Sequence, residues 1–222
     1  EGYHQALQVR TRQTKPLEWA TATANLATVY ADRIRGDKSA NIERAIEYCQ
    51  QALQVTTRQA VPVEWARVMM NLATVYLSRI QGDRAENIER AIEGYQQVLQ
   101  VFTRQMMPVE WATATMHLAV AYSDRIRGDT ADNMERAIDG YQQALQVRTL
   151  QAMPLEWAQT RHNLASAYAH RIRGDKAENI ERAIESYQQA LQVRTREAMP
   201  LEWAMTTMNL ANAYLFRSRG DR

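Results

Sequence analysis

Residues 154–199 read PLEWAQTRHNLASAYAHRIRGDKAENIERAIESYQQALQVRTREAM, and this stretch recurs along the whole chain. Tryptophan returns every 46 residues, at Trp19, Trp65, Trp111, Trp157 and Trp203. Proline and glycine keep the same period, at Pro16, Pro62, Pro108, Pro154 and Pro200, and at Gly36, Gly82, Gly128, Gly174 and Gly220. In the three interior copies, which begin at 62, 108 and 154, 25 of 46 columns are identical. Five tryptophans in one register indicate a tandem repeat array.

The first half of each repeat has the pattern of an amphipathic helix, which we call the first-type helix. It opens with a proline, whose missing N–H costs nothing at the first helical position, followed by a glutamate that the helix dipole favours. In the first copy, Trp19, Leu26, Tyr30 and Ile34 lie on one helical face. The glycine that follows is typical of a helix C-terminus.

The second half of each repeat predicts another helix, the second-type helix. Asp83 stands three residues before Glu86, as in a capping box, and apolar residues then recur with a helical period from Ile88 to Leu99. We expect both helices to have about 20 residues and to be roughly 30 Å long. Strand alternation is absent from the sequence. The predicted fold class is therefore all-α, an α-solenoid of stacked antiparallel helix pairs.

The repeats predict one continuous array over residues 1–222. Part of a second-type helix occupies residues 1–13, helix pairs occupy 16–59, 62–105, 108–151 and 154–197, and a lone first-type helix occupies 200–219. Solenoid ends need polar caps, and neither end of this sequence carries one. We therefore expect weak head-to-tail self-association through uncapped ends.

Composition excludes several classes of protein. The 27 basic and 25 acidic side chains nearly balance, which argues against nucleic acid held by bulk charge. No run of 18 apolar residues and no charged-then-apolar leader is present, so we expect neither a membrane span nor a secretory signal. The single cysteine excludes an internal disulfide framework and is compatible with a cytoplasmic location.

Two segments of each repeat resemble a known family. Asn-Leu-Ala-Thr-Val-Tyr at 25–30, and again at 71–76, is similar to the Asn-Leu-Gly-x-x-Tyr segment of the first helix of a tetratricopeptide repeat. Residues 91–99, AIEGYQQVL, resemble that family's second helix, Ala-Ile-x-x-Tyr-x-x-Ala-Leu. The period of 46 residues exceeds the family's usual 34, as in the lengthened repeats of kinesin light chain and in cyanobacterial arrays.

The resemblance implies a right-handed superhelix and a scaffold that binds a protein or peptide on its concave face, which the first helices line. The alternative is a sensor or regulatory arm of a larger signalling protease or ATPase whose catalytic domain is absent from this chain. The resemblance does not extend to the lysine–asparagine–arginine clamp by which some family members hold a C-terminal carboxylate. Other residue types stand at the lysine positions here.

Differences between copies concentrate on the first-type helix. Across residues 67–78 and the two equivalent stretches, only Leu72, Ala73 and Tyr76 recur unchanged. If first-type helices line the binding face, the partner contacts variable positions, with methionines giving adaptable apolar contacts. The alternative is that a given methionine packs between neighbouring helices. The predicted partner-binding residues are Arg67, Met70, Thr74, Ser78, Thr113, Met116, Asp124, Gln159, His162, Ser166, His170, Met208 and Asn212.

No residue pattern predicts catalysis, a cofactor or a metal site, so we expect a protein that is not an enzyme. His162 and His170 are separated by about 12 Å along one helix, too far to share a metal ion. His117 and His162 on neighbouring helices lack a third ligand. Cys49 occupies a column otherwise held by tyrosine, which favours a buried structural thiol.

Two polar residue types, arginine and asparagine, also recur at fixed positions of the repeat. Arginine recurs at Arg33, Arg79, Arg125, Arg171 and Arg217. Such a row can follow phosphates, but nearby acidic residues such as Asp37, four residues after Arg33, favour local ion pairs, so nucleic acid is an unlikely partner. Asparagine recurs at Asn25, Asn71, Asn163 and Asn209, where we expect it to hold a backbone group of a neighbouring helix.

Overall fold

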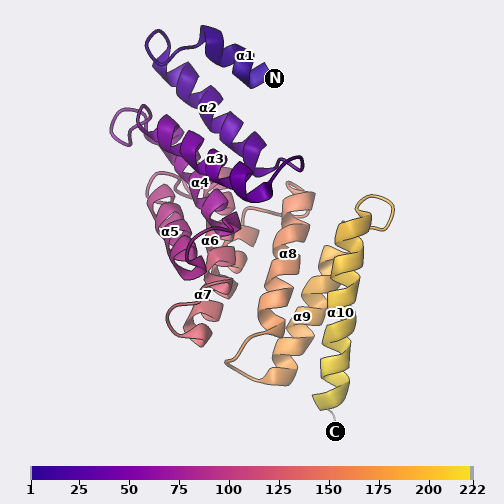
Figure 1. The fold of residues 1–222 in the computed structure, drawn as a ribbon. Helices are drawn as coiled ribbons and strands as arrows, with labels where there is room; N and C mark the ends of the chain where they lie inside the picture. The colour runs from indigo at the N-terminus through magenta and orange to yellow at the C-terminus, as the bar shows by residue number, and fades with distance from the viewer. Residues whose placement is uncertain (1, 221–222) are drawn as a thin grey trace. The chain divides into compact units, whose positions relative to one another are not determined.

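The computed structural model describes residues 2–220, and these residues form ten α-helices and no β-strand (Figure 1). Contacts divide the chain into two units, Glu1–Met106 and Met107–Arg222, which are described separately. The first unit contains α1 (Gly2–Val9), α2 (Pro16–Ala31), α3 (Lys38–Leu53), α4 (Pro62–Ser78) and α5 (Arg84–Val98). The second contains α6 (Pro108–Ser123), α7 (Thr130–Leu145), α8 (Pro154–Ala169), α9 (Lys176–Ala190) and α10 (Pro200–Gly220).

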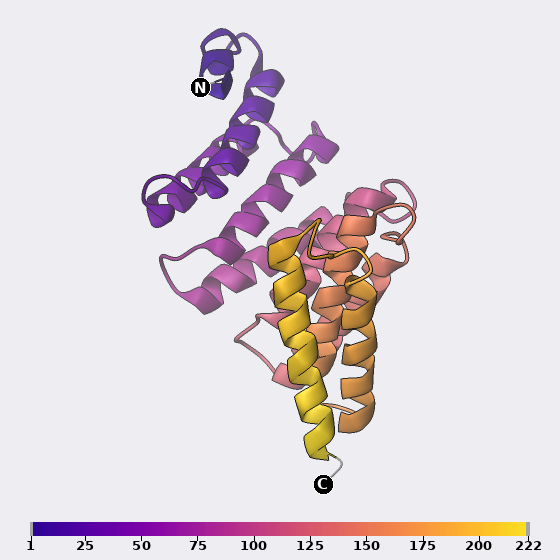
Figure 2. The ribbon, with the colours of Figure 1, turned by 90° about the vertical axis from the view of Figure 1, so that its right-hand side faces the viewer.

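Each unit is a stack of helix pairs. In the first, α2 packs against α3 and α4, and α4 packs against α5. In the second, α8 contacts α7 and α9 along the chain, and it also contacts the first-type helices α6 and α10. Figures 1 and 2 both show α8, α9 and α10 side by side. The all-α solenoid prediction is confirmed.

The helices are shorter than the 20 residues expected. Helices α2 to α9 have 15–17 residues, which corresponds to roughly 24 Å. The rest of the 46-residue repeat lies in connections, such as residues 32–37 between α2 and α3 and residues 54–61 between α3 and α4. Only α10, with 21 residues, reaches the expected length within the described part of the chain.

The expected start signals of the helices are confirmed, but the expected stop signal is wrong: α2 has no basic residue in its last turn, and Gly36 lies five residues beyond its end, directly before the Asp37 cap of α3. Aspartate side chains cap the second-type helices: Asp83 accepts a hydrogen bond of 2.8 Å from the Glu86 N–H. The glycine that precedes each of these caps has a positive φ, for example +78° at Gly82, where a side chain would be strained. The two signals together produce the same turn in every pair.

Arginine and glutamate join successive repeats. The Arg171 guanidinium donates two hydrogen bonds, of 2.8 and 2.7 Å, to the Glu135 carboxylate, and Arg79 binds Glu43 in the same way. The partner therefore lies 36 residues earlier, on the second-type helix of the preceding repeat, and not at the local acidic residue that the sequence suggested. The same guanidinium also reaches Asn179, which holds the loop carbonyl of Arg173.

We expect Glu135→Gln to lower the free energy of unfolding by about 1 kcal/mol, because the bidentate pair is only about a quarter exposed. The hydrogen bond from Arg171 also lowers the pKa of Glu135. Asp132→Asn is the matched control, since the Asp132–Arg173 pair is more than half exposed and its loss should cost less than about 0.5 kcal/mol. Chemical denaturation of both variants checks this, and equal losses would contradict it.

Small and apolar residues fill the space between helices. Alanines at Ala27, Ala45 and Ala52 are fully buried and allow close packing. Cys49 is also fully buried, as expected, and burial raises the pKa of its thiol to about 12. The thiol is therefore a packing group with little thiolate character.

Candidate protein-binding face

The thirteen predicted partner-binding residues are called the variable face, and each unit carries its own part. In the first unit these residues lie on α4. Arg67 and Ser78 are exposed, while Met70 and Thr74 are half-buried. Thr74 donates to the Met70 carbonyl at 3.0 Å, and its hydroxyl lies 2.8 Å from the Tyr95 hydroxyl. The exposed positions are thus the two ends of the helical stripe.

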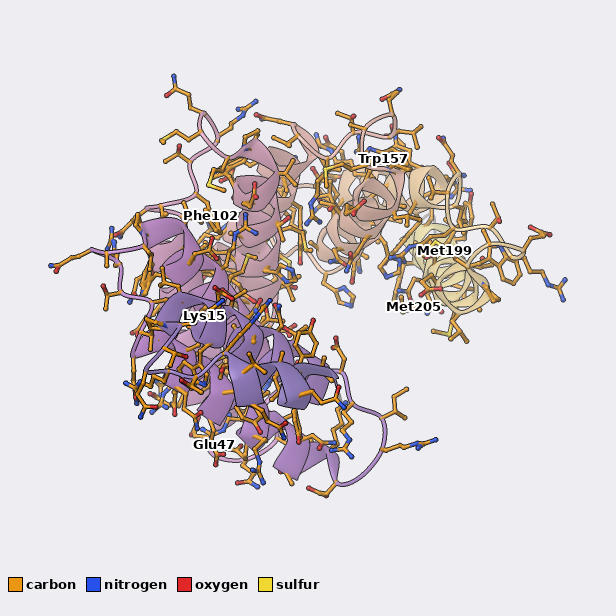
Figure 3. All side chains as sticks on the ribbon, turned by 90° about the horizontal axis from the view of Figure 1, so that it is seen from above. Lys15, Glu47, Phe102, Trp157, Met199 and Met205 are labelled. Atoms are coloured by element: carbon orange, nitrogen blue, oxygen red, sulfur yellow. The ribbon has the colours of Figure 1, made fainter. Side chains whose placement is uncertain are left out.

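In the second unit the variable face runs over three first-type helices that contact one another in sequence, α6, α8 and α10. Its exposed members are Asp124, Gln159, His170, Met208 and Asn212, and its half-buried members are Thr113 and Ser166. Two further exposed apolar side chains, Met205 and Phe216, lie on α10 at positions equivalent to variable columns (Figure 3 labels Met205). The exposed members from the α8 repeat are polar, whereas those on α10 are mostly apolar.

Two predicted residues are buried. Met116 is 2% exposed, and its sulfur lies 3.9 Å from the Asn163 amide nitrogen. His162 is 6% exposed, lies edge-on to the Tyr187 ring, and contacts the Thr206 hydroxyl through Nδ1 at 3.0 Å. Both pack between helices, as the alternative interpretation of the methionines described. They are available to a partner only if neighbouring side chains move.

The geometry around Thr206 determines the His162 tautomer. The Thr206 hydroxyl donates its one hydrogen to the Glu202 carbonyl at 2.7 Å and accepts from Arg194 at 3.0 Å. Its contact with His162 must therefore be a bond that Nδ1–H donates. Burial, followed by the nearby Arg194 charge, lowers the pKa of His162 to about 4, so the ring is neutral at pH 7.

Asn71 and Asn163, two of the periodic asparagines, contact side chains and not the backbone group that we expected. Asn71 donates to the Thr28 hydroxyl at 3.3 Å, and Asn163 lies against the Met116 sulfur. These contacts link adjacent first-type helices beneath the variable face. They help to set the spacing of the exposed side chains.

Three arginines that the sequence did not single out are buried or half-buried in the second unit. Arg148 is 3% exposed and donates to Thr160 and Thr113, and Arg194 is 5% exposed and donates to Thr206. Burial lowers the pKa of each. The third, Arg161, lies on another face of α8. Comparing columns identifies Arg161, because the other four repeats have Thr23, Met69, Thr115 and Thr207 there.

Within residues 2–220, no three histidine, cysteine, aspartate or glutamate side chains gather closely enough to hold a metal ion. None of the helices in the same range has the length and apolar character that a membrane span requires. The side chains of the variable face carry hydroxyls, amides, thioethers, imidazoles and a few charges.

Comparison with known proteins shows which sequences and folds this chain resembles. Residues 65–102 and 157–196 match the model described as "Tetratricopeptide repeat". These two segments are each similar to a tetratricopeptide repeat. The fold is similar to that of BtubC (BKLC) from P. vanneervenii, with a TM-score of 0.64 and 21% identity over 86% of this chain and 70% of that one. No curated protein sequence matches the chain significantly.

The two matched segments run from the first-type tryptophan to just beyond the second-type helix, so each contains one helix pair. The resemblance based on the Asn-Leu-Ala and Ala-Ile-Glu segments is thereby confirmed. Tetratricopeptide repeats generally mediate protein–protein interactions and are typically not catalytic.

Proposed function

We propose that this tetratricopeptide array is a scaffold that binds a protein or peptide partner on the variable face of its first-type helices. The observation that carries the proposal is a contrast between two sets of residues. The aspartate caps and the Arg–Glu pairs that build and join the repeats recur from copy to copy. The exposed positions of α4 and α8 differ from copy to copy.

The composition of the face supports recognition of a mixed polar and apolar partner. In the second unit, exposed Met205 and Met208 supply adaptable apolar area, and Gln159 and Asn212 supply amides. Such a surface offers one set of side chains per repeat to an extended chain or a helix. Variation between repeats then allows each segment of the partner to be distinguished.

The exposed residues, and not the buried pair, provide the test. We expect Gln159→Glu combined with His170→Glu to reduce capture of the bound partner at least tenfold, because a new charge on a contact surface must be desolvated. The control carries Gln151→Glu and Gln192→Glu, two exposed positions outside the first-type helices. Captured protein is quantified by mass spectrometry after purification from the source cells. Equal capture by the two folded variants would contradict the proposal.

A further inference from the structure

A cavity of about 320 Å³ lies between α7, α8 and α9 of the second unit. Its apolar part is formed by Leu145, Leu164 and the Tyr168 ring, and its polar part by Gln142, Arg161, Arg182, Glu185 and Ser186. The Gln142 amide donates to the Tyr168 hydroxyl at 2.8 Å, which fixes one wall. The volume is near the lower end of the range for small-molecule pockets.

This cavity is separate from the variable face. Its residues on α8 are Arg161, Leu164 and Tyr168, whereas the variable face uses Gln159, His162 and Ser166 of the same helix and His170 directly after it. At 3.6 residues per turn the two stripes are centred roughly 180° apart around α8. A ligand in the cavity therefore does not compete with a partner on the variable face.

Arg161 is the unusual residue of the cavity. The equivalent residue is a threonine in three repeats and a methionine in one. The Arg161 guanidinium lies over the Trp157 ring at 5.5 Å, and its buried Nε has no hydrogen-bond partner. Among residues 2–220, Arg161 forms no ion pair within 4 Å, and Glu185 acts on it only at longer range. Because arginine stays protonated, this half-buried charge lacks a close counter-ion.

The charges that line the cavity define what it can hold. Arg182 is already ion-paired with Glu178 at 2.5 Å, so the positive charge left without a close carboxylate is that of Arg161. The Arg182 guanidinium is held over the Tyr168 ring at 5.6 Å, so both guanidinium groups are oriented by aromatic rings. A single carboxylate balances this charge, whereas a dianionic phosphate exceeds it. The planar guanidinium fork also matches a carboxylate geometrically.

We propose that this cavity binds a carboxylate on a short apolar stem, with Arg161 as the anchoring residue and Leu145 and Leu164 against the stem. The carboxylate comes either from a free small organic acid or from an acidic side chain of a bound protein. The chemistry at the anchor is the same for both sources, and the experiment separates them.

NMR of the whole chain, labelled with ¹⁵N, tests the proposal through the Trp157 indole N–H, which reports on the guanidinium above it. Sodium butyrate is titrated at constant ionic strength, with butyramide as the neutral matched probe. A second arm uses the peptide N-acetyl-Ala-Leu-Glu-Leu-Ala-amide and its glutamine analogue. We expect saturable shifts with the charged probe of at least one arm, and at least tenfold weaker binding of its neutral analogue.

The variants Arg161→Thr and Arg161→Met place in this repeat the residues that other repeats carry, so both should fold. Either is expected to weaken binding at least tenfold. Arg196→Thr is the matched control, because Arg196 also lies over a tryptophan ring, that of Trp203 at 5.8 Å, but outside the cavity. Saturation with butyrate supports a free acid, and saturation with the glutamate peptide alone supports a protein side chain. No saturable shift in either arm, or equal binding by Arg161→Thr, overturns the proposal.

Discussion

Trp157→Ala is expected to lower the free energy of unfolding of the second unit by about 3–5 kcal/mol, the range for removing a large buried aromatic side chain. Trp157, labelled in Figure 3, is 8% exposed, whereas the other four tryptophans are half-buried. The substitution also removes the ring under the Arg161 guanidinium. Because repeat arrays are stabilised by neighbouring contacts, the loss should be local and the thermal transition should broaden or split.

Trp203→Ala on α10 is the matched comparison for this prediction. Its ring occupies the same column, but it is more exposed, so a smaller loss is expected. Thermal unfolding followed by circular dichroism measures both variants. A Trp157→Ala protein that melts within a degree of the parent, in a single sharp transition, would show that the ring contributes little to the core.

The second large expected effect is a loss of folding stability at acidic pH. The pKa of His162 is lowered from its ordinary 6.5 to about 4, first by burial and then by Arg194. Between these two values the unfolded chain binds a proton that the folded chain does not bind. The stability that depends on neutral His162 is therefore fully present above about pH 6.5. As the pH decreases toward 4, the free energy of unfolding falls. For one fully buried imidazole the loss is on the order of 2–3 kcal/mol.

His162→Met isolates this contribution, since methionine occupies the equivalent position in three repeats, including Met116. Urea denaturation at pH 7 and at pH 4.5 gives the loss of stability on acidification for each protein. We expect a smaller loss in the variant than in the parent. His117, whose pKa burial also lowers to about 4, remains in both proteins and contributes equally. Identical acid losses would show that His162 is not the titrating group.

Much of the fold could be predicted from local pattern. The 46-residue period, the proline and glycine punctuation and the aspartate caps identify every helix and its approximate start. Helix length was overestimated because apolar periodicity continues past the helix ends. Past α3, Thr56 is 1% exposed and so extends the buried face of the helix, whereas Ile34, the predicted end of the stripe on α2, lies beyond that helix and is 98% exposed.

Contacts between repeats were harder to predict. The bond between Arg171 and Glu135 spans 36 residues, and helical spacing within one segment cannot indicate it. Exposure within the variable columns depends on the neighbouring helix: Met116 is 2% exposed, whereas Met208 in the same column is 59% exposed. Sequence comparison therefore identified the variable columns but could not say which members reach solvent.

The most direct test of the proposed partner-binding face is site-specific photo-crosslinking in the source cells. A benzophenone amino acid is placed at Arg67 or Gln159, which are exposed on the first-type helices, and, as controls, at Gln51 or Gln192, which are exposed elsewhere. We expect the same partner to be crosslinked at both first-type positions and at neither control position. Crosslinks that form equally at all four positions, or only at Gln51 and Gln192, would contradict the assignment.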